Sequence, residues 1–239
     1  MQNSYKRVDA HLSSLGYCSR SEAKKFLKMF KVSIDDVRVF DVTKKAYHND
    51  ISVENEPLDA ESLLLLMNKP SSVTCSHDDA GVLIYSLLPQ RFQRRNPKIS
   101  TIGRLDADTT GAILLTDDGA LNHKLTSPKS DVSKVYEATL AQPLKGDEVE
   151  IFASGELLLH GEKKPLLPAK MEVLSPTHVR LEISEGRYHQ VKRMFGAMGN
   201  RVTALHRVSF GEFSVENLET GEYKVIDFTQ NAQEGKYIT

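Results

Sequence analysis

Apolar residues in the first sixty positions recur at helical spacing and predict a small unit with two helices. The first helix is expected over residues 8–15 and ends at Gly16, a residue type that commonly terminates helices. A second helix follows Ser19, which forms with Glu22 the pattern of a capping box, in which the two residues satisfy free backbone amides. The predicted buried face of this helix contains Ala23, Phe26, Leu27 and Phe30. Short strands are predicted over residues 37–40 and 51–53.

The rest of the chain is richer in strand patterns. Short apolar runs and alternating segments predict strands over residues 63–67, 113–115, 134–140, 178–183, 201–205 and 223–228. One short helix is expected over residues 120–125. A longer helix is expected over residues 188–198, with Val191, Met194, Phe195 and Met198 on one face.

An acidic, proline-containing stretch over residues 54–59 separates these two patterns and is interpreted as a linker. We therefore predict two domains, residues 1–58 and residues 59–239. Helices and strands are mixed without regular alternation, which indicates the α+β class.

Composition excludes several classes of protein. The chain has 239 residues, of which 40% are hydrophobic and 26% charged, as in ordinary globular proteins. The start of the chain lacks the apolar core of a signal peptide, and no apolar run approaches the roughly 20 residues of a membrane helix. The two cysteines, Cys18 and Cys75, make a disulfide framework or a zinc site unexpected and favour a reducing cytoplasm.

The net charge of −1 argues against a nucleic-acid partner, but the distribution of charge argues for one. Seven Lys and Arg stand against two acidic residues over residues 1–31, and six against two over residues 180–207. Residues 91–104 carry five basic residues and no acidic one. Blocks of this kind are often solvated helix faces, yet together they favour a positive surface that faces RNA.

The run from Gly103 to Gly111 holds the candidate catalytic carboxylate. Arg104 and Asp106 lie two residues apart, directly before the apolar run at 112–115. A carboxylate fixed against a rigid strand beside a cation suits a nucleophile or a general base. A polar turn between two strands is the ordinary alternative, and Asp108 competes for the same role.

Two further segments carry candidate chemistry. Lys134-Val135-Tyr136 places a phenol on a strand, and residues 185–194 form a dense basic and hydrogen-bonding run that opens a helix. A strand tyrosine and a solvated helix face are the alternatives. The histidines are scattered, so neither a metal nor another cofactor is expected.

The three segments together resemble, in order and rough separation, the active-site motifs of the RsuA-type pseudouridine synthases. The matching residues are Gly103-Arg104-Leu105-Asp106, Lys134-Val135-Tyr136 and the run from Gly186 to Met194. The N-terminal unit is similar to the S4 RNA-binding domain, with Lys6-Arg7-Val8-Asp9 and Ser19-Arg20-Ser21-Glu22-Ala23 in matching places. The resemblance implies a catalytic domain built on a mixed, largely antiparallel sheet with flanking helices.

The resemblance also implies an activity and a set of site residues. The family isomerises uridine in RNA to pseudouridine after the base is flipped out of its stack. Asp106, Tyr136 and Lys192 would be catalytic. Substrate-binding roles fall to Arg104, Arg187, His189 and Gln190, and RNA-binding roles to Lys6, Arg7, Arg20, Lys24 and Lys28.

The residues of the third motif resemble most closely those of family members that act on 16S ribosomal RNA of the small subunit. The expected partner is this RNA, free or within an assembling small subunit, and the expected state is a monomer. The alternatives are an enzyme acting on 23S ribosomal RNA and a non-catalytic RNA-binding assembly factor. A carboxylate-dependent hydrolase of a small molecule would not explain the basic blocks.

Overall fold

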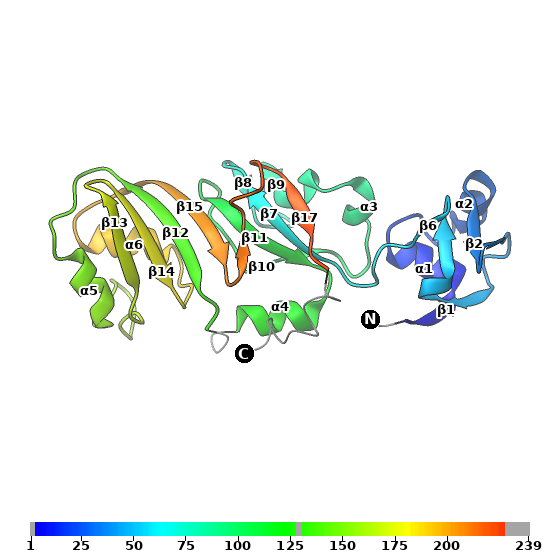
Figure 1. Ribbon diagram of the computed structural model, residues 1–239, viewed down its shortest axis with the longest axis horizontal. Coiled ribbons are helices and arrows are strands. Elements are labelled where there is room, and N and C mark those ends of the chain that lie inside the picture. Colours follow the sequence, from blue (N-terminus) through cyan, green and yellow to red (C-terminus); the bar gives the residue numbers. More distant parts are fainter. Residues whose placement is uncertain (1–2, 128–130, 228–239) are drawn as a thin grey trace.

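The computed structural model describes residues 3–127 and 131–227. The molecule is elongated, with the N-terminal unit at one end and a long sheet that runs through the rest (Figure 1). No helix in the described ranges is long and apolar enough to cross a membrane.

The N-terminal unit packs two short helices against small antiparallel sheets. Its helices are α1 (Val8–Ser14) and α2 (Ala23–Met29), with the 3-10 turn η1 (His48–Asp50). Its strands are β1 (Tyr5–Arg7), β2 (Val32–Ile34), β3 (Val37–Arg38), β4 (Lys45–Tyr47), β5 (Ile51–Val53) and β6 (Glu56–Pro57). Strand β1 pairs with β4, and the other four follow the order β3-β2-β5-β6. A hydrophobic cluster of its own, from Val8 to Leu58, fills this unit.

The two hydrogen bonds of the predicted capping box form, but α2 begins only at Ala23, with Glu22 and not Ser19 at its N-cap. The Ser19 amide donates to Glu22 Oε2 at 3.0 Å, and the Glu22 amide donates to Ser19 Oγ at 3.3 Å. The prediction that Phe30 is buried is wrong, because α2 ends at Met29 and the extended backbone of Phe30 leaves its ring 38% exposed. The strand predicted over residues 37–40 is also shorter, and the Phe40 ring lies exposed under the Arg38 guanidinium.

The stretch predicted as a linker is partly a hairpin. Glu54 and Asn55 have φ values of 53° and 69°, as the two central residues of a tight hairpin turn require. The chain then forms β6 against β5, and Leu58 is buried in the N-terminal cluster. The sheet of the N-terminal unit therefore extends to Pro57, within this stretch.

The remaining strands form one nine-stranded sheet and a two-stranded ribbon. The sheet contains β7 (Leu64–Lys69), β10 (Ser100–Ile102), β11 (Thr110–Thr116), β12 (Lys134–Leu140), β13 (Lys170–Ser175), β14 (His178–Ile183), β15 (Val202–Phe210), β16 (Phe213–Ser214) and β17 (Tyr223–Val225). The ribbon pairs β8 (Val73–Thr74) with β9 (Val82–Leu83). The main order is β13-β14-β12-β15-β11-β7-β17, with β10 on β11 and β16 on β15.

All pairings in this sheet are antiparallel except one. Strands β11 and β15 are parallel and pair only through Thr110 with His206 and Gly111 with Arg207. The predicted α+β class and the mixed, largely antiparallel sheet are confirmed. The last predicted strand was placed over residues 223–228, of which Phe228 lies outside the described residues.

Helices cover the sheet on both faces. They are η2 (Ile84–Leu87), α3 (Gln90–Gln93), α4 (Gly119–Thr126), α5 (Glu148–Ser154) and α6 (Gln190–Ala197). Helices α5 and α6 bury Phe152, Val191, Met194 and Phe195 in the larger core, which also holds Met67 and Ile113. Helix α4 packs on the opposite face, where Leu66 and Leu114 point. Alternation along β7 and β11 thus supplies both cores.

Candidate active site

The loop between β10 and β11 carries Asp106 and is held at both ends. Gly111 at its far end has φ 104°, and a Cβ there would lie 2.1 Å from the Arg207 carbonyl oxygen. Leu105 and Thr109 are buried on either side of Asp106. Beneath the loop, the buried Lys69 ammonium donates to the carbonyls of Ala107 and Thr109. These contacts leave the half-buried carboxylate of Asp106 in a fixed position.

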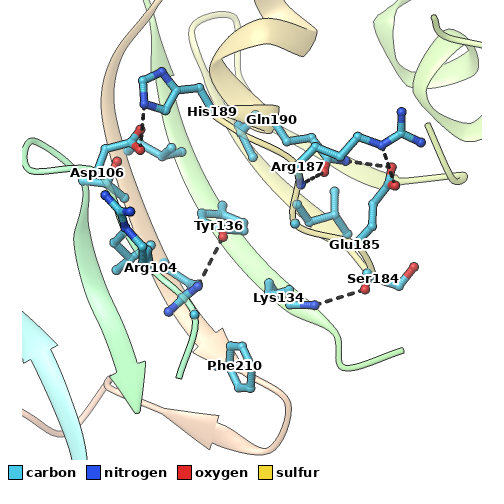
Figure 2. Close-up of a pocket in the computed structure, with 18 of the residues that line it drawn as sticks. Arg104, Asp106, Lys134, Tyr136, Ser184, Glu185, Arg187, His189, Gln190 and Phe210 are labelled. Carbon is cyan, nitrogen blue, oxygen red and sulfur yellow. Dashed lines mark hydrogen bonds and ion pairs between the residues drawn. The ribbon is translucent and has the colours of Figure 1, made fainter. Parts of the chain in front are cut away.

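Two basic side chains, Lys192 and His189, contact Asp106, and Lys192 also contacts Asp108. The Lys192 ammonium lies 2.8 Å from Asp106 Oδ2 and 2.7 Å from Asp108 Oδ1. His189 Nε2 lies 3.1 Å from Asp106 Oδ1 (Figure 2). Together with the Lys192 contact, this engages both oxygens of Asp106. Among the described residues, no group of three His, Cys, Asp or Glu side chains is placed to hold a metal.

The contacts within this cluster shift the pKa values of Asp108 and Lys192. The hydrogen bond from Lys192 lowers the pKa of Asp108 below its usual value, and the positive charge acts in the same direction. Burial would lower the pKa of Lys192, but hydrogen bonds to Asp106 and Asp108 outweigh it and raise that pKa. Lys192 is therefore firmly cationic.

A phenol is provided by β12, which is separated from β11 by β15 in the sheet. Tyr136 on β12 is buried, and its hydroxyl accepts a hydrogen bond of 3.5 Å from Arg207 on β15. Arg207 donates through Nε to the Ala112 carbonyl at 2.6 Å and lies over the Phe210 ring. Nearby, Lys134 donates to the Ser184 carbonyl at 3.0 Å, and burial lowers its pKa, as does the charge of Arg207.

These groups surround one cavity of 500 Å³. In Figure 2, Asp106 and Arg104 lie on one side of it and Glu185 and Arg187 on the other, with Tyr136 between them. Every predicted catalytic and substrate-binding residue lines it: Arg104, Asp106, Tyr136, Arg187, His189, Gln190 and Lys192. The three segments that are remote in sequence are therefore adjacent in space.

The predicted substrate-binding residues differ in how free they are. Arg104 is exposed, and the structure records no ion pair for it among the described residues. Arg187, by contrast, donates to Glu185 Oε2 at 2.9 Å and to the Lys164 carbonyl at 2.7 Å. The Gln190 side chain accepts from the Arg187 amide and donates to Glu185. Both side chains are engaged in building the cavity wall.

The predicted RNA-binding residues lie in the N-terminal unit and also divide into two groups. Lys6 is ion-paired with Glu61 at 3.2 Å, and Arg7 with Asp9 at 2.7 Å. Arg20, Lys24 and Lys28 are exposed, and no ion pair is recorded for them in the described part of the chain.

Arg207 lines the cavity but was not among the predicted site residues. The strand predicted over residues 201–205 ended before it, whereas β15 continues to Phe210. Polar residues at 206, 207 and 209 hid the strand, because the apolar alternation breaks there. The signal that could have found it is an arginine in the same stretch as Val208 and Phe210, a charge that needs internal partners when buried.

The sheet, the cavity and the carboxylate loop define an enzyme class when compared with known proteins. The family model described as RNA pseudouridylate synthase matches residues 63–197, and the chain belongs to this family.

Particular relatives extend the similarity over nearly the whole chain. Ribosomal small subunit pseudouridine synthase A of Pasteurella multocida (strain Pm70) is 41% identical over 223 residues, which cover 91% of this chain and 94% of that protein. The protein of the same name from Escherichia coli (strain K12) is 39% identical over 225 residues, covering 91% and 95%. A crystal structure described as pseudouridylate synthase has 39% identity and a TM-score of 0.66, and the match covers 98% of this chain and 100% of that one.

Proposed function

We propose that the chain isomerises a specific uridine of 16S ribosomal RNA, the RNA of the small ribosomal subunit, to pseudouridine. The observation that carries this proposal is the single cavity onto which Asp106, Tyr136 and Lys192 converge from three separate elements. The names of the relatives in Pasteurella multocida and Escherichia coli support the choice of the small subunit. A cytoplasmic location and a monomeric state stay predictions from the sequence.

In the proposed reaction, Asp106 is the catalytic carboxylate. The bond between uracil N1 and C1′ breaks, the uracil turns, C5 bonds to C1′, the C5 proton is lost to solvent, and N1 takes up a proton, so the product is an isomer of the substrate. Asp106 either attacks C1′ or removes the 2′ proton. In both alternatives the Lys192 ammonium, 2.8 Å from Asp106 Oδ2, is the cationic partner of this carboxyl group.

Tyr136 and Arg104 are assigned to the flipped nucleotide. The Tyr136 ring lies against the uracil, and its hydroxyl assists the final proton transfer. Arg207 supports this role, because it orients the phenol from beneath while its own Nε is held by Ala112. Arg104 is exposed at the cavity, so its planar cation can fill the space that the base leaves or grip a phosphate. Arg187, His189 and Gln190 complete the wall around the substrate.

We assign residues 1–58 to an S4-like RNA-binding domain and residues 59–239 to the catalytic domain. The separate hydrophobic cluster of the N-terminal unit supports this division. Arg20, Lys24 and Lys28, exposed on and before α2, are its proposed phosphate contacts.

Replacement of Asp106 tests the proposal. Asp106→Asn should reduce tritium release from [5-³H]uridine-labelled 16S transcript to below about one thousandth of the wild-type rate, with RNA binding retained. Asp108→Asn is the matched control, because Asp108 contacts the same ammonium but is 73% exposed. This control should keep most of the activity. Normal turnover by Asp106→Asn would remove the assignment.

The substrate requires a separate experiment. We expect pseudouridine in 16S transcript, or in 16S RNA bound to early ribosomal proteins, and none in 23S transcript. Mapping by carbodiimide treatment and primer extension distinguishes these outcomes. Product in 23S RNA alone would favour the large-subunit alternative, and binding without any product would favour a non-catalytic assembly factor.

A further inference from the structure

An exposed aromatic ring is stacked on the histidine that contacts the candidate catalytic carboxylate. The Tyr188 side chain is 76% exposed, more than any other large hydrophobic residue in the described part of the chain. Its ring lies 3.8 Å from that of His189, with an angle of 18° between the planes. His189 in turn lies 3.1 Å from Asp106. The Tyr188 ring is stacked on the His189 ring, and His189 contacts the carboxylate through Nε2, so these contacts connect Asp106 to the solvent-exposed Tyr188.

The backbone beneath this stack is rigidly anchored on both sides. The Arg193 guanidinium donates to the Tyr188 carbonyl at 3.1 Å and is ion-paired with Glu162 at 2.8 Å. On the preceding side, Arg187 is held by Glu185 and by the Lys164 carbonyl. A ring presented from a fixed backbone loses little conformational freedom when it binds a partner.

No internal role accounts for the exposure of Tyr188. It does not belong to any of the hydrophobic clusters, and no hydrogen bond to its hydroxyl is recorded within the described residues. His189, which shares the stack, lines the cavity and has the left-handed φ of 48° where the chain enters α6. This conformation is uncommon for a residue other than glycine, so the stack is built at a specific and unusual turn.

We propose that Tyr188 is an RNA contact residue, which stacks on an unpaired base of the substrate next to the uridine that enters the cavity. This inference rests on the proposed function, since a flipped uridine leaves neighbouring bases unstacked at the cavity mouth. Unstacked bases are commonly bound on exposed aromatic rings. The Tyr188 ring has a face available to receive such a base, and its other contact, His189, connects it to Asp106. An RNA base is favoured over a protein partner because the exposed cation Arg104 lines the cavity that His189 also lines.

Three substitutions at one position test this proposal. Tyr188→Phe keeps the ring and should bind 16S transcript like the wild type. Tyr188→Leu keeps an apolar side chain but no π face, and Tyr188→Ala removes both. The Leu and Ala variants should each bind about tenfold more weakly, as for the loss of one stacked base. Leu174→Ala, at an exposed apolar residue near the β13–β14 hairpin turn, should leave binding unchanged.

A photo-crosslink provides a second and independent readout. Transcript substituted with 4-thiouridine should crosslink to Tyr188 in the wild-type protein, as mapped by mass spectrometry of the digested adduct. Wild-type binding by Tyr188→Ala, or equal losses in the Phe and Ala variants, would overturn the proposal. Crosslinks confined to other surfaces, or Tyr188-dependent self-association in sedimentation, would overturn it as well.

This outcome is distinguishable from failure of the proposed function. If the wild-type protein forms no pseudouridine but still binds RNA in a Tyr188-dependent manner, the activity is wrong and the contact stands. If the variants without the ring form pseudouridine at the wild-type rate and bind 16S transcript with the wild-type affinity, the activity stands and the contact is wrong.

Discussion

The basic residues of α2 and those around α6 are used in opposite ways. Near α2, Arg20, Lys24 and Lys28 face solvent without a recorded partner in the described chain. Around α6, Arg187, Lys192 and Arg193 are each bound to carboxylates between 2.7 and 2.9 Å away. The two regions have similar local composition. The cations near α2 have no recorded ion pair within the described chain, whereas those around α6 are paired with carboxylates of the same chain.

This difference changes the interpretation of the basic blocks. In the block at residues 91–104, Arg91 is paired with Asp59, and Arg95 is buried against Asp117 at 2.6 Å. Both arginines belong to a basic block from which the sequence predicted a positive surface. Local excess of Lys and Arg therefore indicates an RNA-facing surface only where no acidic residue from elsewhere in the fold reaches the cations.

Among these basic residues, replacement of Lys192 should have the largest effect on activity. Lys192→Met deletes the ammonium that contacts Asp106 and Asp108, so tritium release should fall by about 10³-fold. The side chain is only partly buried, so the melting temperature should change little. A variant that unfolds early, or one that retains wild-type turnover, would contradict an active-site role for this cation.

Arg95 is buried and its neighbour Arg94 is exposed, so replacing each in turn compares a buried cation with an exposed one. The Arg95 guanidinium has no exposed area and pairs with the equally buried Asp117, so Arg95→Met leaves an unpaired internal carboxylate. We expect a loss of about 3 kcal/mol in the free energy of unfolding, measured by urea denaturation. Arg94→Met, at an exposed position, should cost less than about 0.5 kcal/mol. Equal losses in the two variants would remove the distinction.

Neutralisation of the α2 region should have the smallest and most specific effect. The combined change Arg20→Gln, Lys24→Gln and Lys28→Gln should weaken binding of 16S transcript about tenfold and reduce the slope of log K against log salt by about 2. A matched triple at Lys98, Lys170 and Lys224, exposed in the catalytic part, should have less effect. If the second triple has the larger effect, the RNA surface lies elsewhere.

Long, regular segments were predictable from the sequence. The strands over residues 134–140 and 178–183 have the predicted bounds, because they alternate cleanly between the core and solvent. Helix α6 buries Val191, Met194 and Phe195 as its spacing requires. It begins two residues later than predicted, since left-handed His189 interrupts the helix there.

Features that depend on long-range pairing were not predictable. The hairpin turns at Asp35-Asp36 and Glu54-Asn55 lack the glycine that normally marks such turns, although all four residues have positive φ. Strands β1, β2 and β4 have three residues each, too few to show a period. The motifs placed Asp106, Tyr136 and Lys192 in one site, but the partners of Arg187 and Arg207 come from residues that no local pattern connects to them.

The short parallel seam between β11 and β15 determines which parts of the sheet meet at the candidate site. It joins two halves of the sheet through two residue pairs, and one of them is Gly111, where the strands approach too closely for any side chain. Asp106 precedes the seam on one half, whereas Tyr136 and the α6 segment belong to the other. The loop that carries Asp106 and the elements that carry Tyr136 and Lys192 therefore meet across this seam, and at Gly111 only a residue without a side chain fits between the two strands.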